Sequence, residues 1–201
     1  MPANMTRAAA DVIALITLML WPAVPLFWVP VHCMPRFFKR LGFLTYVLPC
    51  VTWLPVACLV FLHRTFLFGA RFPLPPAVNI GGALILVAGV ALQIWTLLLL
   101  KFPVIMGMPE VTAKVRGELV TGGPFSVIRH PTYVSHTLML LGVFLMTGVA
   151  ATGAVALVDL LIVNVIIIPL EERELAERFG DEYERYRQRV PSRFFPRKFH
   201  R

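Results

Sequence analysis

The chain has 201 residues, of which 58% are hydrophobic and only 15% are charged, and its mean hydropathy is +0.75. Because a soluble domain carries about a quarter charged residues, this composition excludes an ordinary soluble domain, and the long apolar runs indicate a protein whose solvent is lipid. The net charge of +8 does not indicate nucleic acid as a partner, because the basic residues lie in loops and in the tail, where they face anionic membrane lipids.

Five apolar runs follow one another along the chain, and each predicts a membrane helix. They cover residues 12–31, 41–62, 78–100, 131–147 and 154–170. About 20 residues cross a hydrocarbon core, so the first three runs are long enough, while the last two are shorter and form a tight helical hairpin. Prolines in the first two runs predict kinks. The first run is longer than a signal-peptide core, so we expect a retained helix, and the fold class is an all-α polytopic membrane protein.

The basic residues are divided unequally between the two sides of this helical bundle. The side of the N-terminus holds 3 of the 19, namely Arg7, Arg64 and Arg71, and the opposite side holds the other 16. The positive-inside rule assigns the richer side to the cytoplasm. The sequence therefore predicts an integral membrane protein with its N-terminus outside and its tail in the cytoplasm.

The tail after the fifth run carries one apolar stripe at helical spacing. The stripe consists of Leu175, Phe179, Tyr183, Tyr186 and Val190. It predicts an amphipathic cytoplasmic helix that continues from the fifth membrane helix and ends before Pro191. We therefore divide the chain into three membrane helices in residues 1–100 and a candidate catalytic region in residues 101–201, which holds the cytoplasmic loop, the hairpin and the tail helix.

The pattern of cysteines and histidines indicates neither a disulfide framework nor a metal site. The cysteines are Cys33, Cys50 and Cys58, an odd number without a C-x-x-C pair. His130 and His136 do not have the i,i+4 spacing of a zinc-binding helix. We therefore expect no bound metal.

The sequence Arg-His-Pro-Thr-Tyr, residues 129–133, opens the fourth membrane helix. Pro131 suits the first position of a helix, and the unpaired backbone N–H groups that follow it favour an anionic group. Arg129 adds a fork of donors for a carboxylate or a phosphate. The alternative is an interface anchor, with Arg129 among headgroups and Tyr133 in the aromatic belt. This segment alone leaves both interpretations open.

Two adjacent carboxylates, Glu171 and Glu172, lie at the other end of the hairpin. By themselves they are interpreted as the solvated start of the tail helix. The hairpin, however, places them beside residues 129–133, so that one site offers carboxylates and anion-binding N–H groups together. A ligand with both an ammonium and a carboxylate group, such as an amino-acid moiety, fits this combination.

Among the polar residues within the predicted membrane helices, four could have a function. They are Gln93, His136, Asp159 and Asn164. An intramembrane carboxylate is a candidate functional group, but for Asp159 we favour a structural hydrogen bond or a hydrated position. We assign no function to these four residues from the sequence.

Several motifs recur in order in the second half of the chain. They are Leu119-Val120, Gly123-Pro124-Phe125, Arg129-His130-Pro131-Thr132-Tyr133, Pro169-x-Glu171-Glu172, Leu175, Phe179-Gly180, Tyr183, Tyr186 and Phe195-Pro196. Over residues 117–196 the sequence resembles the isoprenylcysteine carboxyl methyltransferase family and its phospholipid methyltransferase relatives. Ser135-His136 departs from this pattern, because many members have Gly soon after the Tyr, and the departure concerns the shape of the substrate channel.

The resemblance implies S-adenosylmethionine as the methyl donor, bound on the cytoplasmic side. The residues that it assigns to this cofactor are Leu119, Val120, Gly123, His130, Pro131, Tyr133 and Glu171. The residue chemistry agrees, because Glu171 can take the ammonium group and Tyr133 can face the sulfonium in a cation–π contact.

The candidate catalytic residues are Arg129, which would orient the acceptor, and Glu172. Candidate bases are limited to His130, His136 and Glu172. A carboxylate acceptor needs no base, whereas an amine or a thiol must lose a proton first, so we favour carboxyl methylation of an isoprenylcysteine-like acceptor that enters from the bilayer. The alternatives are a phospholipid-amine or thiol methyltransferase, a nicotinamide-dependent lipid reductase, and a non-catalytic membrane partner.

Overall fold

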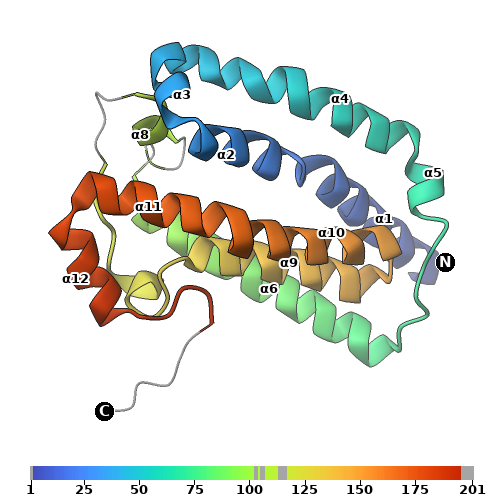
Figure 1. Ribbon diagram of the computed structural model, residues 1–201. Helices are drawn as coiled ribbons and strands as arrows, with labels where there is room; N and C mark the ends of the chain where they lie inside the picture. The colour runs from blue at the N-terminus through green and yellow to red at the C-terminus, as the bar shows by residue number, and fades with distance from the viewer. Residues whose placement is uncertain (1, 102–103, 105–106, 113–116, 196–201) are drawn as a thin grey trace.

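The computed structural model describes residues 2–101, 104, 107–112 and 117–195, and these residues form a bundle of helices (Figure 1). Within the described residues, the β-structure consists of one isolated bridge between Arg71 and Val149. The predicted all-α fold is therefore confirmed for the part of the chain that the structure describes.

The first part of the chain crosses the bundle twice. Its elements are α1 (Pro2–Leu20), α2 (Ala23–Cys33), α3 (Pro35–Leu41), the 3₁₀-helix η1 (Gly42–Val47), α4 (Leu48–Leu62) and α5 (Arg64–Leu67). The predicted kink in the first crossing is confirmed, because α1 and α2 are separated at Trp21 and Pro22, where proline interrupts the backbone hydrogen bonds. The first helix begins earlier than predicted, because the alanine-rich residues before the apolar run are strong helix formers.

The second part of the chain holds the hairpin and the tail. Its elements are α6 (Pro76–Leu99), α8 (Met108–Val111), the 3₁₀-helix η2 (Gly123–Ser126), α9 (Pro131–Thr147), α10 (Ala150–Ile162), the π-helical η3 (Val163–Ile167), α11 (Ile168–Phe179) and α12 (Asp181–Arg189). The helix α9 has the predicted bounds, and α10, η3 and α11 form one continuous rod.

Four helical segments are long and apolar enough to cross a membrane. They are Arg7–Cys33, Pro35–Leu62, Pro76–Leu99 and Ala150–Phe179, and α9 is a shorter apolar helix between the last two. Large apolar side chains on these segments point outward, as Leu98 does with 80% of its surface exposed. Such exposure suits a lipid environment rather than water. The protein is therefore an integral membrane protein, with α9 completing the five predicted crossings.

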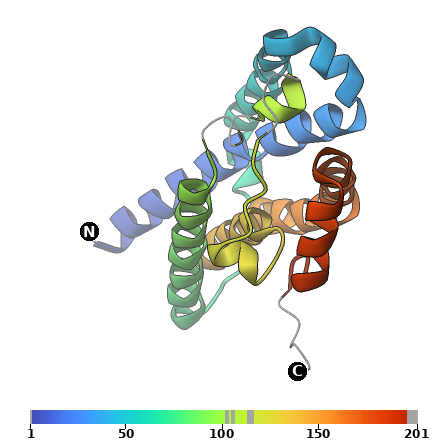
Figure 2. The same cartoon turned by 90° about the vertical axis from the view of Figure 1, so that its left-hand side faces the viewer.

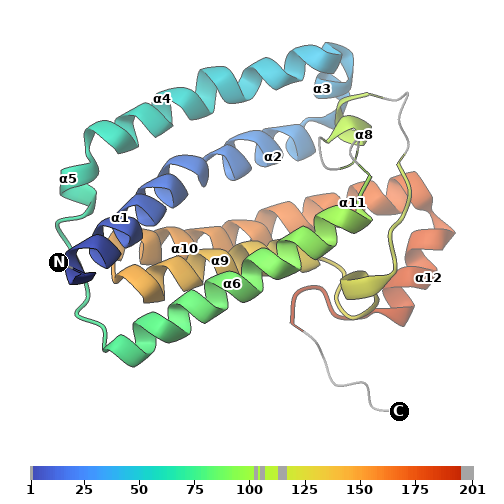
Figure 3. The same cartoon turned by 180° about the vertical axis from the view of Figure 1, so that it is seen from behind.

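The helices α6 and α9 pack most closely, and α6 runs alongside α9 (Figure 3). Glycines make this approach possible: a Cβ atom built on Gly142 of α9 would lie 2.5 Å from the backbone N of Leu86 on α6, and one built on Gly89 would lie 2.9 Å from the backbone N of Met139. Small residues at a membrane helix interface allow such backbone contact. The pair forms a rigid support for the start of α9.

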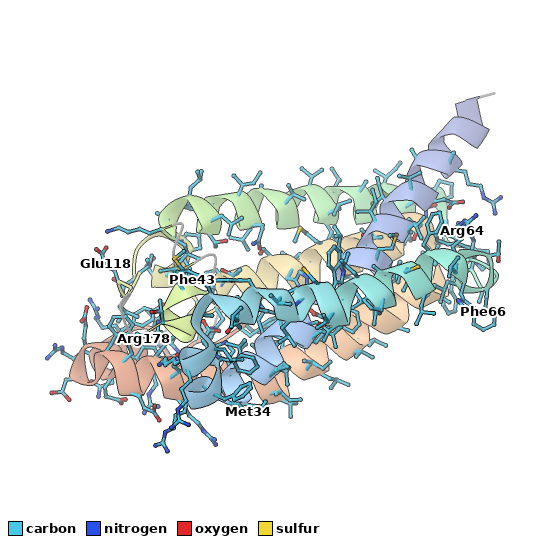
Figure 4. All side chains as sticks on the ribbon, turned by 90° about the horizontal axis from the view of Figure 1, so that it is seen from above. Met34, Phe43, Arg64, Phe66, Glu118 and Arg178 are labelled. Carbon is cyan, nitrogen blue, oxygen red and sulfur yellow. The ribbon has the colours of Figure 1, made fainter. Side chains whose placement is uncertain are left out.

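One end of the bundle is closed by contacts between segments far apart in the sequence. Phe72 N–H donates to the Gly148 carbonyl at 2.8 Å, and Arg71 Nη1 lies 2.8 Å from Asp11 Oδ1. Arg64 lies at this end, whereas Glu118 and Arg178 lie at the opposite end (Figure 4). The connections between helices therefore alternate between the two ends, as five crossings require.

The tail differs from the prediction at one residue. Gly180 has a φ of 54°, which ends α11 and reorients the chain before α12, so the prediction of one continuous tail helix was wrong. The apolar stripe nevertheless forms one cluster. Tyr183, Tyr186 and Val190 are buried in it, and Leu119, Leu175 and Phe179 pack against them. Figure 2 looks onto this end of the bundle.

The orientation in the membrane stays a prediction. Five of the basic residues on which it rests, Lys114, Arg116, Arg197, Lys198 and Arg201, lie outside the described residues. We expect Cys33, exposed at the end of α2, to react with an impermeant maleimide only from the cytoplasmic side in a Cys50→Ser, Cys58→Ser background.

The matched control for this labelling experiment replaces Arg64 with cysteine in a Cys33→Ser, Cys50→Ser, Cys58→Ser background, and the cysteine at position 64 is expected to react only from the outside. Labelling of Cys33 from the outside would reverse the predicted orientation.

Candidate active site

A buried ion pair joins the start of α9 to the start of α11. Arg129 and Glu172 are 7% and 5% exposed, and Glu172 Oε1 accepts from Arg129 Nη2 at 2.7 Å and from Nε at 2.9 Å. Arg129 Nη1 donates to the Val190 carbonyl at 2.7 Å. Arg193 Nη2 lies 2.6 Å from the second Glu172 oxygen. The guanidinium of Arg129 is therefore held by the Glu172 carboxylate and by the Val190 carbonyl.

His130 lies between the two adjacent glutamates. Its ring Nε2 is 3.3 Å from Glu172 Oε1, and its Nδ1 is 3.6 Å from Glu171 Oε2. The backbone N–H of His130 donates to the Arg193 carbonyl at 3.1 Å, and that of Arg129 donates to the Ser192 carbonyl at 2.9 Å. The segment after α12 thus folds back over residues 129–130 and holds their backbone in place.

Two polar atoms near His130 are buried without a hydrogen-bond partner among the described residues. They are Glu171 Oε2 and the Tyr183 hydroxyl. Burial raises the pKa of Tyr183, so its hydroxyl stays neutral and keeps its proton to donate. Buried polar atoms are seldom left unpaired, so these two atoms are where a polar ligand would be expected to bind.

Both atoms belong to residues that line one cleft, which we call the tail cleft. It has a volume of about 650 Å³, including space open to solvent. Its lining comes from the segment 117–130 and from α11 and α12, and includes Leu119, Val120, His130, Glu171, Glu174, Leu175, Arg178, Tyr183 and Tyr186. The tail cleft combines apolar walls with a few convergent polar groups, as small-molecule sites do.

A second space, which we call the membrane cavity, lies among the helices. It has a volume of about 1210 Å³, including open space, and is more apolar than the tail cleft. Its lining comes from α2, α6, α9 and α11, and includes Val24, Trp28, His32, Gln93, Leu97, Thr132, Tyr133, His136 and Glu171. Arg129, His130 and Glu171 line both spaces, so the tail cleft and the membrane cavity meet at these residues.

The residues predicted for the cofactor are mostly gathered at this junction. Leu119, Val120, His130 and Glu171 line the tail cleft, and Tyr133 lines the membrane cavity. Two of the set line neither space. Pro131 is buried in the first turn of α9, and Gly123 turns the loop beneath Leu99 and Trp95. The structure thus places five of the seven residues around the two spaces, while the role of each residue stays a prediction.

The two predicted catalytic residues differ in their access to these spaces. Arg129 lines both, whereas Glu172 lines neither and is enclosed by Arg129, His130 and Arg193. Glu172 is therefore poorly placed to accept a proton from a substrate, and its contacts are those of a residue that positions its neighbours.

Among the intramembrane polar residues, Asp159 is 1% exposed, so the hydrated position is excluded. Its Oδ1 accepts from Trp21 Nε1 at 2.9 Å, which confirms the predicted hydrogen bond, and lies 3.3 Å from His136 Nδ1. Gln93 accepts a hydrogen bond from the Ser135 hydroxyl. Asn164 Nδ2 donates to the Leu160 carbonyl at 2.9 Å within its own helix.

The first hundred residues contribute to the site in a way that the sequence does not reveal. His32 of α2 lines the membrane cavity, and its Nδ1 lies 2.9 Å from Glu174 Oε2, a residue of the tail cleft. No motif surrounds His32 in the sequence, so only the tertiary contact between α2 and α11 identifies it. Among the described residues, no group of three or more His, Cys, Asp or Glu is arranged to hold a metal ion.

Comparisons with known proteins identify a family and several relatives. The sequence model of the family "Phospholipid methyltransferase" matches residues 78–182. The chain is 38% identical over 87 residues, or 43% of its length and 39% of the relative's, to the cobalt-zinc-cadmium resistance protein CzcN of Cupriavidus metallidurans. It is 32% identical over 87 residues to the nickel-cobalt-cadmium resistance protein NccN of Alcaligenes xylosoxydans xylosoxydans, again 43% of this chain and 40% of the relative.

A eukaryotic relative carries an enzyme name. The chain is 35% identical over 81 residues to the protein-S-isoprenylcysteine O-methyltransferase of Schizosaccharomyces pombe, which is 37% of this chain and 31% of that protein. The match to each of these three relatives thus spans between 31% and 40% of the relative's length.

Proposed function

Because this chain belongs to the phospholipid methyltransferase family, we propose that it transfers a methyl group from S-adenosylmethionine to a lipophilic acceptor that enters from the bilayer. One observation carries the proposal. The tail cleft, which carries convergent charged and polar groups, meets the membrane cavity at His130 and Glu171, so that a charged donor can approach from water and a lipophilic acceptor from lipid.

The tail cleft fits the chemical groups of S-adenosylmethionine, which supplies a methyl group activated on a sulfonium. Glu171 Oε2, which accepts no hydrogen bond from the part of the chain that the structure describes and lies 3.6 Å from His130 Nδ1, is suited to accept from the ammonium group, and the Tyr183 hydroxyl is suited to donate to an oxygen or a ring nitrogen. Leu119 and Val120 offer apolar surface for the adenine ring. Tyr133 lines the membrane cavity with its ring centroid 5.9 Å from that of His130, and an aromatic ring in this position suits a cation–π contact with the sulfonium.

The membrane cavity suits an acceptor with an apolar tail. Val24, Trp28 and Leu97 provide apolar walls, and the polar lining includes His130, Glu171 and His136. A lipid can reach such a cavity laterally without leaving hydrocarbon, whereas a charged nucleotide cannot. The name of the Schizosaccharomyces pombe relative supports an isoprenylcysteine carboxylate as one candidate acceptor.

Arg129 and Glu172 act, in this proposal, by positioning other groups. Three donor contacts of the Arg129 guanidinium are already made to Glu172 and the Val190 carbonyl. The pair thereby holds His130 at the junction of the two spaces. This replaces the expectation that Arg129 binds the acceptor directly.

The decisive test of the donor is the affinity of the detergent-solubilised protein for S-adenosylhomocysteine, measured by isothermal titration. We expect Glu171→Gln to weaken binding by about 10- to 100-fold, because a lost hydrogen bond to a charged group costs about 1.5–3 kcal/mol. Glu177→Gln, on the exposed face of α11, is the matched control and should bind normally.

Two results would count against this assignment. Unchanged affinity in Glu171→Gln would remove Glu171 from the donor site. Binding of a reduced nicotinamide dinucleotide in place of S-adenosylhomocysteine by the unmodified protein would favour the lipid reductase instead.

A further inference from the structure

Resting on the proposed function, we propose that His136 is the base that deprotonates the acceptor and that Asp159 is its positioning residue. The pair lies between α9 and α10, away from the ion pair of Arg129 and Glu172. It defines the acceptor class as lipophilic molecules whose attacking atom carries a proton, namely amines, thiols or phenols.

The orientation of the imidazole follows from which of its atoms are covered. His136 Nδ1 is buried and lies 3.3 Å from Asp159 Oδ1, while the side chain as a whole keeps 21% exposure and lines the membrane cavity. The carboxylate therefore selects the tautomer with its proton on Nδ1, which leaves Nε2 with a lone pair to accept a proton. The two atoms are not aligned as a hydrogen bond here, and such alignment commonly improves when substrate binds.

Asp159 is unusual as a purely structural residue. A carboxylate at membrane depth is unfavourable unless it is paired, yet its Oδ2 is buried without a hydrogen-bond partner among the described residues. Trp21, at the break between α1 and α2, donates to Oδ1 and fixes the carboxylate from a third helix. The indole N–H of Trp21 donates a hydrogen bond to Asp159 but carries no charge. A protonated His136 would supply the positive charge that a buried carboxylate needs as its partner.

Deprotonation of the acceptor and transfer of the methyl group form one displacement, in which each new bond replaces a bond that breaks. The bond between the acceptor's heteroatom and its proton breaks, and the proton passes to His136 Nε2. The electron pair of the heteroatom forms the new bond to the methyl carbon. The carbon–sulfur bond of the donor breaks with its pair remaining on sulfur, which yields S-adenosylhomocysteine, and His136 later releases its proton to solvent.

The pair of His136 and Asp159 does not suit the carboxylate acceptor that the sequence favoured. A carboxylate is ionised in water and needs no base, so a histidine and aspartate pair in the acceptor cavity would serve no chemical purpose for it. The other titratable or charged side chains around the membrane cavity are His32, Arg129, His130, Tyr133 and Glu171. All of them remain in a His136 variant, so a change in that variant is attributable to His136.

The test compares three acceptors with the same chain length: dodecanethiol, dodecylamine and dodecanoate. We expect methylation of the thiol or the amine, and a loss of at least about 100-fold in that turnover in His136→Gln, the range of general base catalysis. Affinity for S-adenosylhomocysteine should be unchanged. Asn79→Ala is the matched control and should keep its turnover per folded molecule. It removes hydrogen bonds between α6 and α9, and Asn79 lines neither the tail cleft nor the membrane cavity.

A second measurement needs no methyl donor. When 2-dodecyl-4-nitrophenol binds to the protein, its visible absorbance reports ionisation, which we expect at lower pH with the unmodified protein than with His136→Gln or Asp159→Asn. Equal ionisation in all three proteins, or methylation of dodecanoate alone, would overturn the role of His136. Failure of the unmodified protein to bind S-adenosylhomocysteine would instead overturn the proposed function.

Discussion

Replacing Glu172 with glutamine is expected to destabilise the folded protein by about 3–5 kcal/mol, the typical result of removing one partner of a buried ion pair. Arg129 is 7% exposed, and Glu172 is its anionic partner, so the substitution leaves a buried guanidinium without compensation. Arg193 loses the same partner. Unfolding by denaturant in detergent, followed by tryptophan fluorescence or by circular dichroism, measures the change in free energy.

An exposed ion pair of the same tail provides the control. Glu184 and Arg187 lie 3.0 Å apart with both side chains about half exposed, and Glu184→Gln should therefore change stability by less than about 1 kcal/mol. If Glu172→Gln were as mild as this control, the buried pair would not hold the tail in place. A double variant of Arg129 and Glu172 should lose less than the sum of the two single variants, because the pair is coupled.

Replacing Gly142 with leucine should prevent the normal packing of α6 against α9. A Cβ atom at this position would lie 2.5 Å from Leu86 N and 2.8 Å from Leu86 Cα, and neither backbone atom can move aside as a side chain can. The helices must separate, and we expect a loss of about 3 kcal/mol or more. The yield of monodisperse protein in size-exclusion chromatography and the denaturation midpoint both report this loss.

Gly81 is the matched position for this experiment. It lies on α6, and a Cβ atom there would meet nothing within 4 Å. Gly81→Leu should therefore fold normally and only add apolar surface facing lipid. Equal behaviour of the two leucine variants would show that the close approach of α6 and α9 does not determine stability.

The sequence predicts the helices well because their signals are local. An apolar run with a proline at its start specifies α9. In the tail, the apolar stripe alone suggested one helix, but Gly180 has a positive φ and the chain turns there. The hairpin also follows from local signals, which is why residues 130 and 171 could be expected to lie near each other.

The acceptor side of the site is different, because it depends on contacts between distant helices. Trp21 and Asp159 are 138 residues apart, and neither belongs to a recognisable motif. His32 and Glu174 are 142 residues apart and meet only because α2 packs on α11. Packing of this kind leaves no periodic signal in one sequence, so the entry of an acceptor from the bilayer could be predicted, but the contribution of α1 and α2 to the site could not.

The way in which residues 190–193 fold back onto Arg129 and His130 sets an order for biosynthesis. The carbonyls of Val190, Ser192 and Arg193 accept hydrogen bonds from residues 129–130, and they leave the ribosome after all five membrane helices have been made. The helices can therefore insert into the membrane before the chemical centre exists. Assembly of the site must therefore wait for residues 190–193, and a nascent chain stays without it until those residues have been made.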